Sequence, residues 1–97
     1  MTRAFPGFAG LRVAGSWAGL IDVTPDAVPV ISPVAALPGL VLASGFSGHG
    51  FGIGPGAGRL AAELATGASP VVDPAPFRLS RLSRFARAEA AAPPLAV

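Results

Sequence analysis

The sequence predicts an α/β fragment, in which a few β-strands are followed by one C-terminal α-helix and an extended tail. Three observations predict this class. Residues 40–44 form a compact apolar run bounded by glycine, which is typical of a buried strand. Residues 55–66 place alanine and leucine at three- and four-residue spacing, which is typical of an amphipathic helix. Proline recurs after residue 69, which favours an extended tail.

The composition is unusual for a domain that folds by itself. Glycine (13) and proline (11) together make 24 of the 97 residues, yet 52% of the residues are hydrophobic and only 12% are charged. Disordered chains show the opposite balance, with few apolar residues and many charges. A chain this apolar and this rich in turn residues needs other surfaces to pack against. We therefore expect it to be a piece of a larger fold.

The charge pattern predicts a solvated tail. The net charge is +2, and all seven basic residues are arginine. Four of them lie near the C-terminus, at Arg78, Arg81, Arg84 and Arg87. Apolar residues recur between them at three-residue spacing, so we expect a short half-buried segment with a basic outer face. A peptide that binds lipid or nucleic acid is the weaker alternative, and we predict no nucleic-acid partner.

Composition also limits the chemistry. The chain has no cysteine, which excludes disulfides, cysteine-ligated metals and a cysteinyl link to a cofactor. We predict no metal site. Residues 27–58 carry no formal charge, but prolines and glycines interrupt them too often for a membrane-spanning helix. We therefore expect no membrane span and a cytoplasmic location.

The chain is predicted to divide into three parts. Residues 1–10 show no periodic pattern and are expected to form an irregular stub. Residues 11–69 form the body, with strands, a glycine-rich loop and a helix. Within it, residues 11–23 contain β-formers and small residues and are consistent with a strand. Residues 70–97 form the extended tail, whose last part, 86–97, is rich in alanine and proline and is expected to fray.

Turn residues separate the predicted strands of the body. Thr24-Pro25-Asp26 is expected to form a turn. The apolar run at 28–31 follows it, and Pro29 confines this run to a sheet edge or a strand start. Leu37-Pro38-Gly39 forms a second turn. It precedes the apolar run at 40–44, which we expect to be a fully buried, central strand.

A glycine-rich segment connects the last strand to the helix. Seven of the twelve residues at 45–56 are glycine or proline. Pro55 is expected in the first turn of a helix over 55–66, where its missing N–H costs nothing. Gly67 stands where a left-handed C-cap is needed. The unit therefore consists of a buried strand, a glycine loop and a helix N-terminus.

This unit is suited to holding an anion or a dipole. Glycines allow backbone N–H groups to approach a ligand closely, and the helix start adds about half a positive charge. The loop fits the dinucleotide fingerprint G-x-G-x-x-G poorly, since the pattern fails from Gly48 and from Gly50 and ends in Ala57 from Gly52. On spacing alone, a tight strand–helix connection without a ligand remains an equal alternative.

Several motifs occur in order along residues 12–85. They are Trp17-Ala18-Gly19-Leu20, Thr24-Pro25-Asp26 with Pro29 and Ile31, Gly45-Phe46-Ser47-Gly48-His49-Gly50-Phe51-Gly52, Gly58-Arg59-Leu60, Glu63-Leu64 with Gly67, and Phe77-Arg78-Leu79-Ser80-Arg81. Together they resemble the closing region of the D-amino-acid oxidase-like FAD-dependent oxidoreductases. Within this family they resemble most the sarcosine oxidase β-subunit and related amine dehydrogenases.

The resemblance implies a C-terminal fragment of an FAD-binding domain. It implies that the parent protein oxidises the C–N bond of a small amine or amino acid by hydride transfer to flavin. It also implies that the loop binds the cofactor, with backbone N–H groups of residues 48–52 facing the N1/C2=O edge of the flavin ring. The implied cofactor-binding residues are Ser47, Gly48, His49, Gly50, Phe51, Gly52 and Ile53.

Five side chains are interpreted individually. His49 is the only histidine and is a candidate catalytic base, with orientation of the loop as the alternative. Trp17 is a candidate wall of the substrate pocket. Asp26 is interpreted as a turn residue rather than a base. Arg59 and Glu63 are four residues apart and are expected to form a surface ion pair.

The sequence departs from the family pattern at three positions. Ile21 stands where related amino-acid oxidases carry an arginine for the substrate carboxylate, and Gly52 stands where monomeric sarcosine oxidases carry a lysine. Gly19 occupies about the place of the cysteine that tethers flavin in some relatives. The G-x-G-x-x-G unit for the ADP half of FAD is not in the sequence. FAD binding is therefore expected to need the N-terminal half or a partner chain that supplies it. The alternative is a non-catalytic small subunit, or a truncated product, that completes a partner's flavin site.

Overall fold

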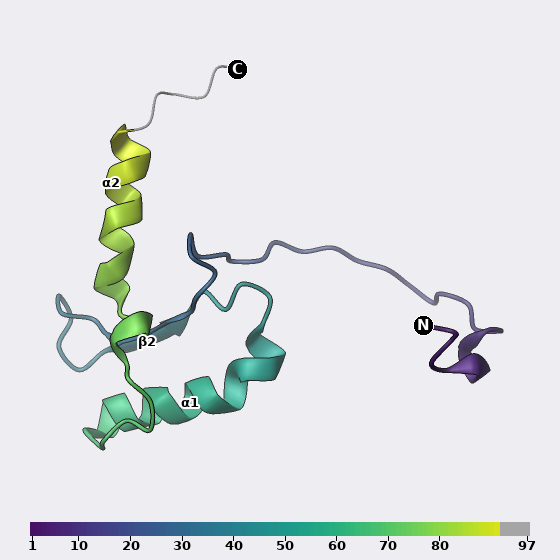
Figure 1. The fold of residues 1–97 in the computed structure, drawn as a ribbon, viewed down its shortest axis with the longest axis horizontal. Helices are drawn as coiled ribbons and strands as arrows, with labels where there is room; N and C mark the ends of the chain where they lie inside the picture. Colours follow the sequence, from purple (N-terminus) through teal and green to yellow (C-terminus); the bar gives the residue numbers. More distant parts are fainter. Residues whose placement is uncertain (92–97) are drawn as a thin grey trace.

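The computed structural model describes residues 1–91 as an elongated arm followed by a small packed body (Figure 1). The body contains a pair of strands, a long helix, and a tail that ends in a second helix. In chain order the elements are η1 (Pro6–Phe8), β1 (Val30–Pro33), β2 (Val41–Ser44), α1 (Gly50–Thr66), η2 (Ala75–Phe77), η3 (Leu79–Leu82) and α2 (Ser83–Ala91), where η marks a 3₁₀ turn.

The two strands form an antiparallel hairpin. Val30 pairs with Ser44, and Pro33 pairs with Val41. The connection closes where the Val34 N–H donates to the Leu40 carbonyl at 3.0 Å. Gly39 has a φ of +89°, so the predicted turn at Leu37-Pro38-Gly39 is confirmed. The turn at residues 24–26 is confirmed as well, because the Ala27 N–H donates to the Thr24 carbonyl at 3.0 Å.

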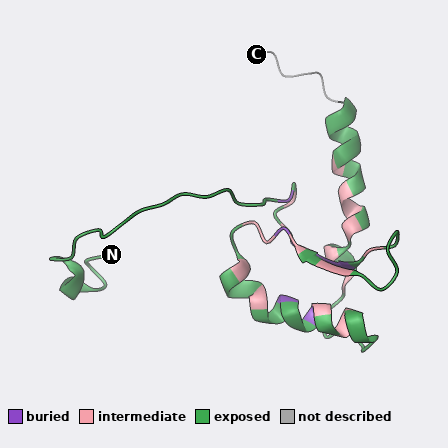
Figure 2. Cartoon of the chain, turned by 180° about the vertical axis from the view of Figure 1, so that it is seen from behind, coloured by how far each residue is buried: buried purple, intermediate pink, exposed green. Residues whose placement is uncertain are grey.

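The core lies between β1 and α1. Ile31, Ala57 and Leu60 form its buried centre, and Phe46, Leu64 and Phe77 are among the half-buried residues packed around it. Figure 2 shows the buried positions gathered on β1, on one face of α1 and in the segments that flank the strands. Because α1 and the tail both contact β1, this strand is buried along most of its length.

The prediction of a fully buried, central strand at 40–44 was wrong. β2 is one of two strands in the described sheet, and none of its residues is fully buried. β1 is the buried strand instead, although Pro29 and Pro33 flank its apolar residues. An apolar run indicates that a strand will be covered, but the elements that cover it lie far away in the sequence.

Helix α1 begins earlier than predicted. It starts at Gly50, directly after the loop, and therefore contains Pro55 in its interior. The His49 carbonyl accepts the N–H groups of Gly52 and Ile53, at 3.1 and 3.2 Å. Pro55 has no N–H for the Phe51 carbonyl, and Figure 1 shows α1 change direction near its N-terminal end. Helices bend in this way where proline removes a backbone bond.

The N-terminal arm does not pair with the sheet. Residues 11–23 were expected to include a strand, but residues 11–20 run in an exposed, extended path away from the body (Figure 1), and Asp22 contacts the loop after β2 without pairing as a strand. The expected stub at 1–10 contains the short turn η1, and the rings of Phe5 and Phe8 stack there at 5.5 Å. The radius of gyration is 19.0 Å, whereas a compact domain of this length measures about 13 Å.

The tail is more regular than predicted. Residues 70–97 were expected to be extended, but η2, η3 and α2 occupy most of residues 75–91. Alanine, arginine and glutamate dominate α2, and all three favour helix. The prolines on either side of this segment obscured that signal. The predicted fraying of residues 86–97 falls partly on residues 92–97, which lie outside the described part of the chain.

Two glycines, one that caps α1 and one inside it, provide a matched test of the helix end. Gly67 caps the helix with a φ of +73°, as predicted, whereas Gly58 lies inside it, and an added Cβ would meet nothing within 4 Å at either site. We expect Gly67→Ala to lower the free energy of unfolding by about 1 kcal/mol. We expect Gly58→Ala to raise it by about 0.5–1 kcal/mol. Thermal unfolding followed by circular dichroism measures both, and equal effects would rule out the left-handed cap.

Candidate functional site

The segment between β2 and α1 is a tight loop with unusual backbone geometry. Gly45, Ser47 and Gly48 have φ values of +71°, +53° and +81°. This conformation is unfavourable for serine, so it persists only where neighbouring contacts hold it. The Ser47 N–H donates to the Asp22 carbonyl at 3.2 Å, and the Ser47 hydroxyl accepts the Thr24 N–H at 3.2 Å. The segment before β1 therefore holds the loop in place.

The loop presents backbone donors that have no acceptor within residues 1–91. The N–H groups of Gly48, Gly50 and Phe51 make no hydrogen bond there, whereas that of His49 donates to the Phe46 carbonyl at 2.9 Å. Two of these free donors belong to the start of α1, where the helix dipole adds positive potential. The first turn of α1 carries no acidic side chain. The arrangement suits an electron-rich acceptor. The carboxylate of Asp22 lies at the start of the loop, where it accepts the Ser44 hydroxyl at 3.5 Å.

The predicted cofactor-binding residues are contiguous, and the structure places Ser47, Gly48, His49, Gly50, Phe51, Gly52 and Ile53 in the loop and the first turn of α1. Phe51 is fully exposed, and a Cβ at Gly52 would meet nothing within 4 Å. His49 is exposed at the N-cap of α1, where its side chain makes no capping hydrogen bond. This surface of the loop is therefore open to a ligand.

In the described part of the chain, Trp17 does not contact the loop. It lies on the N-terminal arm with 92% of its surface exposed. A wall of a pocket needs further elements around it, so its predicted role at the substrate pocket remains a prediction.

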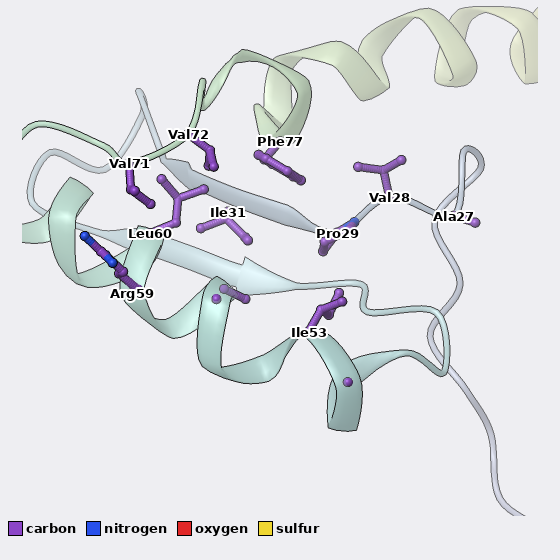
Figure 3. A pocket seen from close by; sticks show the side chains of 13 residues that line it. Ala27, Val28, Pro29, Ile31, Ile53, Arg59, Leu60, Val71, Val72 and Phe77 are labelled. Carbon is purple, nitrogen blue, oxygen red and sulfur yellow. The ribbon is translucent and has the colours of Figure 1, made fainter.

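An apolar cavity lies beside the loop, and sequence reasoning did not find it. It has a volume of about 680 Å³, is partly open to solvent, and is lined by residues of β1, of α1 and of the tail segment that contains Val71 and Phe77 (Figure 3). Ile53 joins it to the loop, because its side chain lines the cavity wall. Its walls come from segments up to about fifty residues apart, so no local sequence pattern could predict the cavity.

Arg59 is the charged residue that lines this cavity, and its position is fixed by Glu63. Arg59 Nε donates to a Glu63 carboxylate oxygen at 3.0 Å, which confirms the predicted ion pair. The other Glu63 oxygen accepts the Val71 N–H at 3.0 Å. The Val71 hydrogen bond, with that of Arg59, lowers the pKa of Glu63 below its ordinary value. Glu63 thus ties the helix to the beginning of the tail.

A second ion pair joins the tail to the turn before β1. Arg81 Nε donates to Asp26 Oδ2 at 2.8 Å, and a terminal nitrogen of Arg81 donates to Asp26 Oδ1 at 3.1 Å. Asp26 also accepts the Val28 N–H at 3.1 Å, which confirms it as a turn residue. The Arg81 hydrogen bonds hold the pKa of Asp26 well below its usual range. The pair spans 55 residues, so sequence spacing could not indicate it.

Two classes of feature are not found in the described residues. Within residues 1–91, no three histidine, cysteine or acidic side chains are grouped closely enough to hold a metal ion. None of the helices in this part of the chain is both long and apolar enough to cross a membrane.

Comparison with known proteins gives consistent results. The family model described as FAD dependent oxidoreductase (DAO) matches residues 1–64. The chain is 38% identical to glycine oxidase of Pseudomonas aeruginosa over 72 residues, covering 74% of this chain and 20% of that protein. It is 38% identical to peroxisomal sarcosine oxidase of Mus musculus over 65 residues, covering 67% of this chain and 17% of that protein.

A solved structure resembles the fold as well. The L-amino acid deaminase from Proteus vulgaris superimposes with a TM-score of 0.70 and 38% sequence identity. The match covers 82% of this chain and 18% of the deaminase chain. This chain therefore spans about a fifth of the length of the relatives that it matches.

The ion pair of Asp26 predicts that stability falls in acid. Because the folded state lowers the pKa of this carboxyl group, its contribution is complete above the ordinary Asp pKa of about 3.9 and is lost as the pH falls through the lowered folded value. We expect Asp26→Asn to unfold at lower urea concentration than the unchanged chain at neutral pH. Its unfolding midpoint should also depend less on pH below about pH 5. Glu63 is present in both proteins, so the difference isolates Asp26, and parallel pH profiles would contradict the assignment.

Proposed function

The chain belongs to the family of FAD-dependent oxidoreductases, and we propose that it forms the C-terminal portion of an enzyme that oxidises the C–N bond of an amine or amino acid. The observation that carries the proposal is the open loop between β2 and α1. Its free donors, Gly48, Gly50 and Phe51, lie within the residues that match the family model. The names of the relatives, glycine oxidase and sarcosine oxidase, support a small amine or amino acid as substrate.

The loop fits one edge of a flavin ring. We assign the N–H groups of Gly48, Gly50 and Phe51 to the N1/C2=O edge, because that edge offers acceptors to donors that lack a protein partner. Ser47, held in its left-handed conformation by Thr24 and Asp22, begins the turn, and the surface around these donors is completed by His49, Gly52 and Ile53. The fit also depends on the absence of acidic side chains from the first turn of α1, since a carboxylate there would repel negative charge at the ring edge.

FAD, when bound, would accept the hydride that leaves the substrate carbon. The residues of this chain contribute binding and electrostatics. Backbone donors and the N-terminal end of α1 stabilise negative charge at the adjoining edge, which favours acceptance of electrons. Gly52 lets this backbone come close to a planar ring, because a Cβ there would stand on the open side of the loop.

His49 and Trp17 have separate proposed roles. His49 lies at the helix N-cap beside the free donors and is exposed, so we assign it an orienting contact with the cofactor. Proton transfer from the substrate is the alternative role for this side chain. Trp17 is assigned to the wall of the substrate pocket, which requires parts of the fold outside residues 1–91 to cover the arm.

On this proposal, the remainder of the flavin site lies outside the 97 residues. The sequence has no G-x-G-x-x-G unit for the ADP half of FAD. The exposed arm and the large radius of gyration support a need for further surfaces. We propose that either an N-terminal half or a partner chain supplies them. A small non-catalytic subunit that completes a partner's flavin site is the second candidate, favoured by the same exposed surfaces.

The first test concerns the chain by itself. We expect the purified 97-residue chain to be colourless and to bind FAD more weakly than about 1 mM, or about −4 kcal/mol, because one loop contacts one edge of the cofactor. Absorbance of bound flavin in the purified chain would contradict this. Titration with FAD, followed by the fluorescence of the flavin, measures the affinity.

The second test concerns the loop in a complete flavoprotein that contains this chain. We expect Gly50→Val and Gly52→Val to weaken FAD binding at least about tenfold, or about 1.4 kcal/mol. A Cβ at Gly52 stands in open space and would hold the ring away from the donors, whereas a Cβ at Gly50 meets the Phe46 side chain at 3.7 Å, so that valine there displaces the loop. Gly58→Val is the matched control for Gly52→Val, since a Cβ at either helical site meets nothing within 4 Å. Normal FAD content and midpoint potential in both loop variants would rule out the loop as the flavin contact.

The same flavoprotein separates the two roles of His49. If His49 orients the loop, His49→Ala should lower the turnover rate only a few-fold, with an unchanged pH profile. If His49 is the base, the variant should lose about 100-fold or more, together with one arm of the pH profile. We expect the first result.

A further inference from the structure

Arg81 makes the most extensive set of side-chain contacts between distant parts of the described chain. It binds both carboxylate oxygens of Asp26, and the same guanidinium group donates to the carbonyl oxygen of Val28. Its side chain is 12% exposed and that of Asp26 is 18% exposed. Arg81 lies outside residues 1–64, the segment that the family model matches.

The contacts of Arg81 continue to the glycine loop through Thr24. The Val28 carbonyl that accepts Arg81 also accepts the Thr24 hydroxyl, at 2.8 Å. The Thr24 N–H in turn donates to the Ser47 hydroxyl at 3.2 Å. Thr24 is 8% exposed, and its methyl group lies so near Gly45 that a Cβ there would be only 2.5 Å away. Every link between the tail and the loop is therefore a buried or half-buried contact.

Backbone strain is found at both ends of this network. In residues 1–91, the two non-glycine residues with positive φ are Ala27, at +56°, and Ser47, at +53°. Ala27 stands between Asp26 and Val28, the two residues of the turn that Arg81 binds. Ser47 is held by Thr24 and by the Asp22 carbonyl. A positive φ at a residue other than glycine persists only where surrounding contacts hold it. One hydrogen-bond network contacts both Ala27 and Ser47.

We propose that Arg81 is a positioning residue for the glycine loop: by clamping the turn at residues 26–28, it fixes Thr24 against Ser47 and so sets the direction of the free N–H groups of Gly48, Gly50 and Phe51. Its effect on a cofactor rests on the proposed flavin contact of this loop, whereas the coupling between Arg81 and the loop does not. Within residues 1–91, the other tail arginines donate no side-chain hydrogen bond to the turn or the loop, and Arg84 lies over the ring of its neighbour Phe85.

Amide hydrogen exchange of the 97-residue chain, measured by NMR, tests the coupling. The reporters are the N–H groups of Thr24, Ser47 and His49, each of which donates a hydrogen bond in the network or the loop. In Arg81→Gln we expect these amides to exchange about tenfold faster, the scale for losing hydrogen bonds to a charged group. Exchange of the β1–β2 ladder should remain unchanged, which a general loss of stability would not allow.

Two further variants and one control sharpen the test. Arg81→Lys should recover part of the protection, because an ammonium group keeps the charge but cannot bind the carboxylate in the same two-pronged way. In a Ser47→Ala background, Arg81→Gln should have no additional effect on His49, because the link through Thr24 is already broken. Arg84→Gln removes a tail charge without touching the network, so its amide exchange rates should match those of the unchanged chain.

The outcomes separate this inference from the proposed function. Equal acceleration of loop and ladder, the same effect in Arg84→Gln, or unprotected Ser47 and His49 amides in the unchanged chain would each overturn the positioning role. The Gly50→Val and Gly52→Val variants of the complete flavoprotein test the flavin contact alone. Normal FAD binding in both variants, with the coupling between Arg81 and the loop intact, would reject the flavin contact and leave the role of Arg81 standing.

Discussion

Leu60 of α1 is the most deeply buried large side chain in residues 1–91, and it packs with Ile31 of β1. This contact sets the position of the helix against the hairpin. Since α1 starts within a few residues of the end of β2, its seat on β1 also decides where the connecting loop lies. Phe77 joins the same cluster from the tail, so the return of the chain across β1 depends on it as well. The loop, the cavity and the tail contacts are all arranged around one small apolar cluster.

Turn and cap residues predicted the parts of the fold that depend on the conformational preferences of single residues. Gly67 caps α1 because only a residue without a Cβ takes that conformation cheaply, and the turns at Pro25 and Gly39 follow from their own backbone preferences. The start of α1 was missed because Pro55 is equally compatible with a first turn and with a bent helix interior. The burial of β1, the unpaired path of residues 11–23 and the helix α2 depend on which segments lie beside one another.

In the candidate site too, the local features could be predicted from sequence and the long-range contacts could not. Residues 47–53 are contiguous, so a resemblance in sequence could propose the whole loop as a cofactor contact. The sequence could not tell which backbone N–H groups of the loop are free and which are hydrogen-bonded, because this depends on the left-handed turns at Ser47 and Gly48. Arg81 was interpreted as part of a solvated basic face, yet its guanidinium group binds Asp26 from 55 residues away. A long side chain in a polar segment can point toward the interior, and the charge pattern of a sequence does not predict the direction of that side chain.

Pro55 gives α1 a mechanical property that a regular helix would lack. The first turn, which carries the exposed donors, is joined to the body of the helix without the backbone bond from residue 55 to the Phe51 carbonyl. A small tilt of this turn therefore stretches one fewer hydrogen bond, while Ala57 and Leu60 stay seated on β1. The first turn of α1 can therefore change its angle slightly relative to the rest of the helix without loosening the apolar cluster that holds the chain together.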